Sequence, residues 1–157
     1  MKIIFLDFDG VITTAESGYR IDPDKCNMIK EICDATDAKI VISSSWRRGY
    51  LEKTIDAITN EERLYGNQPF TIPEYVFGIT NRMYSCKYGC ADERYGVYRG
   101  VEIDRYIVEH TDITNYVILD DDRDMLLTQK DNFIQTDGHY GISDKDVIKA
   151  IKILNKK

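Results

Sequence analysis

Short apolar runs alternate along the chain with segments whose apolar side chains recur at helical spacing. The runs that predict buried strands are residues 2–6, 39–42, 74–79, 116–119 and 132–136. The segments that predict helices are residues 24–35, 46–58, 101–108 and a last helix opening at Ser143, where Asp146 three residues later completes a capping box.

Strands that alternate with helices indicate right-handed crossovers and a parallel sheet covered on both faces. We therefore predict an α/β fold, a doubly wound three-layer Rossmann-like sheet, in which ligands bind beyond the carboxyl ends of the strands. A chain of 157 residues is the usual size of one domain, so residues 1–157 are expected to form a single unit.

Residues 81–99 interrupt this alternation and are rich in glycine and tyrosine, which predicts a long loop. Aromatic and basic side chains interleave in it: Tyr84, Tyr88, Tyr95 and Tyr98 with Arg82, Lys87, Arg94 and Arg99. Such a mixture can stack on bases and contact phosphates of single-stranded nucleic acid, but it is also compatible with a partly packed surface loop.

Composition narrows the classes of function. Hydrophobic residues make up 43% and charged residues 31%, no stretch is long and apolar enough to cross a bilayer, and no secretory h-region is seen, so a cytoplasmic protein without membrane partners is expected. The four cysteines lack paired CxxC spacing, so free thiols are expected. The net charge of −6 argues against nucleic-acid binding through an overall field, although a local basic patch stays compatible with it.

The first predicted strand ends in Asp7-Phe8-Asp9-Gly10, and alternation along a strand would send both carboxylates to one side. Such a pair can bind a hard cation, or one carboxylate can attack as a nucleophile while the other donates a proton. An Asp-Gly turn that satisfies local backbone groups is the alternative.

Two further motifs follow later strands. Ser43, Ser44 and Ser45 precede Trp46 and Arg47 at the expected start of a helix, where an anion is favoured, although plain helix capping by Ser44 or Ser45 also explains them. The acidic run after the fourth strand calls for a compensating cation such as magnesium or for a helix N-terminus, and its residues are Asp120, Asp121, Asp122 and Asp124.

The three motifs together resemble the haloacid dehalogenase (HAD) superfamily, in which an aspartate pair, a Ser or Thr, a basic residue and an acidic cluster occur in this order. The resemblance spans Asp7 to Asp124 and rests on FLDFDGV, VISSSWR and VILDDDRD. RGVEIDRYI followed by VILDDD further resembles the HAD domain of RNA repair proteins.

The resemblance implies that Asp7 attacks phosphorus to form an aspartyl-phosphate, that Asp9 is the acid and base, and that Ser43 binds the transferring group. It also implies a Mg²⁺ ion held by Asp7, the backbone carbonyl of Asp9, and Asp121 or its neighbours Asp120 and Asp122. The expected substrate-binding residues are Gly10, Ser44 and Arg47. The third motif usually has a lysine, where this chain offers Arg99, with Lys87 and Arg94 as rivals.

The resemblance implies the activity of a phosphatase, a Mg²⁺-dependent phosphomonoester hydrolase, because the family members that cleave carbon–halogen bonds lack the acid that Asp9 provides here. Few residues separate Gly10 from the first helix, which suggests an open site without a large cap, able to admit a nucleic-acid end or a nucleotide. A small-metabolite or phosphoprotein phosphatase and a non-catalytic phospho-binding module remain alternatives. The sequence does not indicate an oligomeric state.

Overall fold

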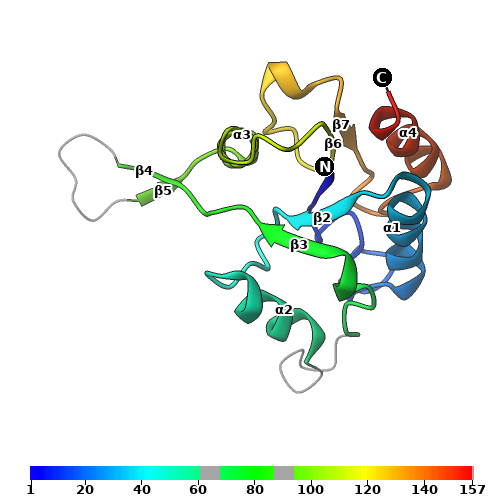
Figure 1. Ribbon diagram of the computed structural model, residues 1–157. Helices are drawn as coiled ribbons and strands as arrows, with labels where there is room; N and C mark the ends of the chain where they lie inside the picture. Colours follow the sequence, from blue (N-terminus) through cyan, green and yellow to red (C-terminus); the bar gives the residue numbers. More distant parts are fainter. Residues whose placement is uncertain (61–67, 87–93, 157) are drawn as a thin grey trace.

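The computed structural model describes residues 1–60, 68–86 and 94–156, and its centre is a parallel sheet (Figure 1). The strand order is β3-β2-β1-β6-β7, and each neighbouring pair is parallel. The strands are β1 (Lys2–Leu6), β2 (Lys39–Ile42), β3 (Val76–Ile79), β6 (Asn115–Asp120) and β7 (Phe133–Gln135). This order confirms the predicted Rossmann-like α/β class.

Helices cover both faces of this sheet (Figure 1). They are α1 (Pro23–Thr36), α2 (Leu51–Thr59), α3 (Arg99–Glu109) and α4 (Asp144–Leu154). Successive side chains of β1 point to opposite faces of the sheet, so they belong to two separate parts of the core. Ile4 and Leu6 pack in the cluster formed with α1, α2 and α4, while Ile3 and Phe5 pack with Ile103 of α3. Capping fixes two of the helix starts, since Asp22 accepts a bond from the Asp24 N–H and the predicted Ser143–Asp146 box is present.

Two predicted elements begin later than expected. The third strand starts at Val76 because Pro73–Tyr75 form a short 3-10 helix, η2, with the proline at its first turn. Helix α2 starts at Leu51 instead of residue 46, so Ser44 and Ser45 do not cap it. The intervening chain turns through Gly49 at φ +88°, a conformation that favours glycine and that a helix does not contain.

The predicted loop over residues 81–99 is wrong in part, because it contains an antiparallel hairpin. Its strands are β4 (Tyr84–Cys86) and β5 (Arg94–Gly96), and they project away from the sheet (Figure 1). Tyr88 and Lys87 lie outside the described residues, as do the side chains of Arg94 and Tyr95. A second 3-10 helix, η3 (Leu127–Gln129), connects β6 and β7.

The two ends of the chain meet at the amino edge of the sheet. Lys2 Nζ donates to Asn155 Oδ1 at 2.7 Å, and Asn115 Nδ2, at the start of β6, donates to the Ile153 carbonyl at 2.9 Å. The carboxyl edge, where the motif residues lie, is therefore the opposite edge. Among the described residues, no helix combines the length and apolar character needed to cross a membrane.

Candidate active site

Hydrogen bonding between neighbouring strands continues one residue past the ends of four strands. The bonds run from the Asp7 N–H to the Leu119 carbonyl at 3.0 Å and from the Ser43 N–H to the Leu6 carbonyl at 2.9 Å. The other two run from the Thr80 N–H to the Ile42 carbonyl and from the Thr136 N–H to the Asp120 carbonyl, both at 3.0 Å. These four residues therefore form one row along the carboxyl edge, held by backbone bonds. The row brings the first two sequence motifs to a common rigid edge.

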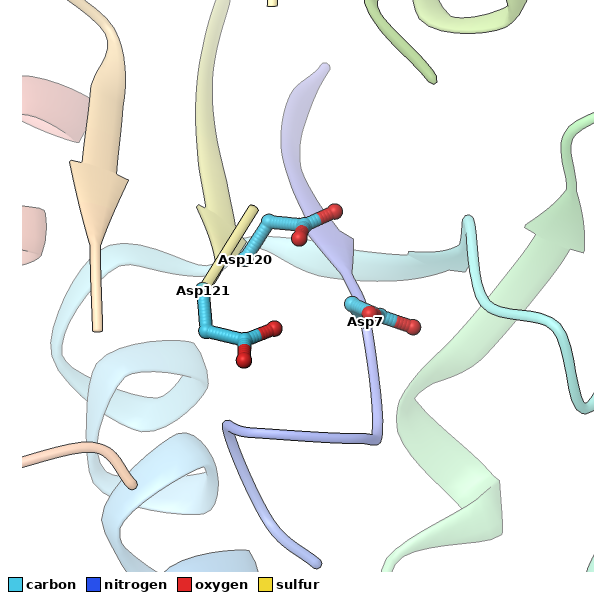
Figure 2. Close-up of side chains that lie close together, drawn as sticks. All are labelled: Asp7, Asp120 and Asp121. Atoms are coloured by element: carbon cyan, nitrogen blue, oxygen red, sulfur yellow. The ribbon is translucent and has the colours of Figure 1, made fainter. Parts of the chain in front are cut away.

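Three carboxylates converge on this edge. Asp7 follows β1, Asp120 ends β6 and Asp121 follows it, and one oxygen of each lies within 4.8 Å of the others (Figure 2). Asp7 and Asp120 are 6% and 1% exposed. Carboxylate oxygens in this arrangement are the ligands that Mg²⁺ prefers, so these residues could hold a divalent cation.

Burial dominates the electrostatics of the cluster. It raises the pKa of Asp7 to about 6, against the lowering effects of a hydrogen bond with Ser44 and of the Arg99 charge. Burial, together with the charge of Asp7, raises the pKa of Asp120 to about 8. Crowded buried carboxylates take up protons unless a cation compensates them, which fits a metal site.

Two glycines make room for Asp121. Gly10 has φ +71°, and a Cβ added there would lie 2.1 Å from Asp121 Cγ. A Cβ on Gly138 would lie 2.6 Å from Asp121 Oδ2. Gly10 therefore lies against a candidate metal ligand, and the substrate-binding role expected for it stays a prediction.

Four buried polar atoms lack a hydrogen-bond partner within the described part of the chain, and all belong to segments of this edge: Ser43 Oγ, Arg99 Nε, Asp120 Oδ2 and Asp124 Oδ1. Buried polar groups in folded proteins are nearly always paired. A donor, a hydroxyl and carboxylate oxygens left open in segments of the same edge fit a site for an anion together with a cation.

Asp9 is held differently from Asp7, because β1 ends at Leu6 and alternation does not extend to Asp9. Its carboxylate is exposed and accepts bonds from Thr13 Oγ1 at 2.8 Å, Trp46 Nε1 at 3.0 Å and Ser45 Oγ at 3.1 Å. The side chain of Asp9 is not one of the three converging carboxylates. The role expected for its backbone carbonyl stays a prediction.

Arg47, predicted to bind substrate, is buried and bonded to protein acceptors. Its Nε donates to the Ser44 carbonyl at 2.6 Å, Nη1 to the carbonyl and hydroxyl of Thr80, and Nη2 to Glu102 Oε2 at 2.8 Å. Arg47 therefore joins the ends of β2 and β3 to α3. The Ser44 hydroxyl lies nearer the cluster, accepting from the Phe8 N–H at 3.4 Å.

Arg99 lies at the first turn of α3 with its guanidinium toward the cluster. Its Nε is 3.8 Å from Asp120 Oδ2, too long for a hydrogen bond, and Nη1 donates to Glu102 Oε2 at 3.4 Å. The Arg99 N–H donates to Asp124 Oδ2 at 2.8 Å, which places Asp124 at the helix start. Asp122 is exposed, and its side chain is not part of the three-carboxylate cluster.

Sequence reasoning missed Thr80 and Glu102. Thr80 could have been found, because it follows the third strand as Ser43 follows the second. Glu102 has no such signal. It is 6% exposed and accepts bonds from Arg47, Arg99 and the Met83 N–H, the last at 2.9 Å.

One of three comparisons with known proteins gives a match. The family model described as the HAD domain in Swiss Army Knife RNA repair proteins matches residues 3–147. No curated protein and no solved structure gives a significant match. The matched span contains the three converging carboxylates, Ser43 and Arg99. The chain therefore belongs to the family of HAD domains found in Swiss Army Knife RNA repair proteins.

Proposed function

We propose that the chain is a phosphatase that hydrolyses phosphomonoesters at nucleic-acid ends or on nucleotides, through an aspartyl-phosphate on Asp7. The observation that carries the proposal is the convergence of Asp7, Asp120 and Asp121 beside the unpaired atoms of Ser43 and Arg99. The family match supports hydrolase chemistry in an RNA repair setting. We further propose that residues 1–157 work as one domain in the cytoplasm.

Asp7 would attack phosphorus in line with the leaving oxygen, forming an acyl-phosphate bond while the phosphorus–oxygen ester bond breaks. Ser43 Oγ and Arg99 would bind the transferring oxygens, since both have buried polar atoms free to do so. Mg²⁺, held by Asp7, Asp120 and Asp121, would neutralise negative charge on the phosphoryl group.

Asp9 would give its proton to the leaving oxygen and then accept one from the water that cleaves the aspartyl-phosphate, releasing inorganic phosphate and restoring Asp7. Thr13, Ser45 and Trp46 would fix the Asp9 carboxylate for both steps. Arg47 would act as a positioning residue, because its donors are bonded to protein atoms.

Asp7→Asn tests the proposal. With Mg²⁺ and an aryl phosphate, the wild type should turn over and D7N should lose at least about 10³-fold in kcat, because an amide is a poor nucleophile. Asp131→Asn, an exposed aspartate on the β6–β7 connection, serves as the matched control and should retain activity. Undiminished hydrolysis by D7N would reject the assignment, and a stable aspartyl-phosphate without released phosphate would support a phospho-binding module instead.

A further inference from the structure

A cavity of about 490 Å³ lies next to the candidate site. Tyr98, which precedes Arg99, forms one wall, and residues 122–126, which follow Asp120 and Asp121, form the other. The volume is within the range of pockets that bind small organic groups. Both walls are thus continuous in the chain with residues of the phosphoryl site.

Contacts between α3 and the segment after β6 fix this cavity. Asp124 accepts bonds from the Arg99 N–H at 2.8 Å and, through its carbonyl, from the Gly100 N–H at 3.2 Å. Gly100 allows a close approach, since a Cβ there would lie 2.6 Å from the Leu126 nitrogen. The cavity is therefore held by fixed backbone on both sides, while the Tyr98 side chain is 70% exposed.

The lining favours a planar, uncharged group over a phosphodiester chain. The Tyr98 ring offers a stacking face, and Met125 and Leu126 add apolar surface. Asp122 and Asp124 would repel phosphate, but the exposed Asp122 carboxylate can accept hydrogen bonds from the amino groups of a nucleobase. Arg123 is the one cation among the described residues of this lining.

We propose that the cavity binds the nucleobase of the terminal nucleotide, the one that carries the scissile phosphate, with Tyr98 stacked on its face. The inference rests on the proposed function and adds a substrate preference to it. A base that enters the cavity between Tyr98 and residues 122–126 has to separate from its pairing partner, so single-stranded ends are the preferred substrates over blunt duplex ends.

Tyr98→Ala tests this proposal with two oligonucleotides that differ only in whether the phosphorylated terminal sugar carries a base. Y98A should raise KM for the base-bearing strand about tenfold, the lower part of the range for one base–aromatic stack, and change the abasic strand less than about twofold. Tyr98→Phe should retain the wild-type KM, because it keeps the ring. Tyr50→Ala, similarly exposed before α2, is the matched control and should change neither substrate.

The outcomes separate the two proposals. If the wild type hydrolyses both strands but Y98A affects them equally, or affects neither, the nucleobase site is rejected and the phosphatase stands. If the wild type prefers blunt duplex ends, the nucleobase site is likewise rejected. A wild type that releases no phosphate from either strand or from an aryl phosphate rejects the proposed function, and this inference with it.

Discussion

Gly10 combines two constraints that are usually separate, a left-handed backbone and a close neighbour. Its φ of +71° favours glycine, and its missing Cβ leaves space that the Asp121 carboxylate occupies. Its carbonyl also accepts a bond from Thr136 Oγ1 at 2.7 Å. One small residue thereby links the first motif to a candidate metal ligand from the last.

Gly10→Ala should weaken Mg²⁺ binding at least about tenfold, because the added methyl displaces Asp121, and should also cost about 1 kcal/mol of stability for the positive φ. Gly18→Ala is the matched control, since Gly18 has φ +64° but no atom within 4 Å of an added Cβ. Calorimetric titration and urea unfolding would measure both effects. Equal Mg²⁺ affinity of the two variants would contradict the role given to Gly10.

Trp46 is expected to position Asp9 as well as pack on the core. Trp46→Phe keeps a ring beside Phe8 but removes the bond from Nε1 to Asp9 Oδ1. Asp9 would then be held by Thr13 and Ser45 alone, so kcat should fall about tenfold or more because its carboxylate is positioned less well. The unfolding free energy should fall by at most about 1.5–3 kcal/mol, the contribution of one hydrogen bond to a charged group. A pH–rate profile identical to that of the wild type would show that Asp9 does not depend on this bond.

At the scale of elements, α3 is tied to the rest of the site by a buried ion pair. Glu102 and Arg47 have side chains 6% and 3% exposed, and their bond joins α3 to the loop after β2. Met83 donates to the same carboxylate, so Glu102 also holds the base of the β4–β5 hairpin. The position of α3, and with it that of Arg99, depends on this group.

Glu102→Ala should cost about 3–5 kcal/mol, because it leaves the Arg47 guanidinium buried without its counter-charge. The same helix provides a control: Glu109 pairs with Arg105 at the surface, where side chains are 38% and 62% exposed, and Glu109→Ala should cost about 0–1 kcal/mol. Denaturant unfolding compares the two variants. Similar losses for both would contradict the account of α3.

The elements that sequence periodicity predicted well are those whose apolar side chains face the sheet. Helices α1 and α4 match within one or two residues, because capping residues mark their starts. The start of α2 was wrong, since Arg47 is drawn into contacts with Thr80 and Glu102 that no local pattern contains. The β4–β5 hairpin was missed because three-residue strands give too short an alternation.

At the scale of the whole molecule, the acidic cluster makes stability depend on pH. Asp120 has a folded pKa raised to about 8, so between about pH 4 and pH 8 the folded chain binds more protons at this group than the unfolded chain does. The contribution of Asp120 to unfolding free energy therefore falls as pH rises through this window. Asp7, raised to about 6, contributes in the same direction.

Asp120→Asn should remove the contribution of Asp120 to this pH dependence in metal-free protein, while that of Asp7 stays. Near pH 4 the variant and the wild type should differ by a small constant in unfolding free energy. By pH 8 the variant should have gained up to about 5 kcal/mol relative to the wild type, at about 1.4 kcal/mol per pKa unit. Urea unfolding in chelator across this range measures the difference, with Asp131→Asn as the control. A difference in unfolding free energy between D120N and the wild type that stays constant with pH would contradict the role given to Asp120.

The convergence of the motifs could be predicted because parallel strands end at one edge, and Asp7, Ser43 and Asp120 each directly follow or end a strand. What could not be predicted is how neighbouring residues of the same type differ in burial and in hydrogen bonding. Asp120 is buried whereas Asp122 is exposed. The Ser43 hydroxyl has no partner among the described residues, whereas the Ser44 hydroxyl accepts bonds from two backbone N–H groups. These differences arise from side-chain direction and three-dimensional packing, which a run of identical residues in the sequence does not reveal.

The contact between Lys2 and Asn155 has a practical consequence for handling the protein. Because both chain ends meet at the edge of the sheet away from Asp7, a surface anchor or a fluorescent label can be attached at either end. The anchored molecules would all present the carboxyl edge to solution. Single-molecule recordings of oligonucleotide arrival could then be made without the tether competing for the site.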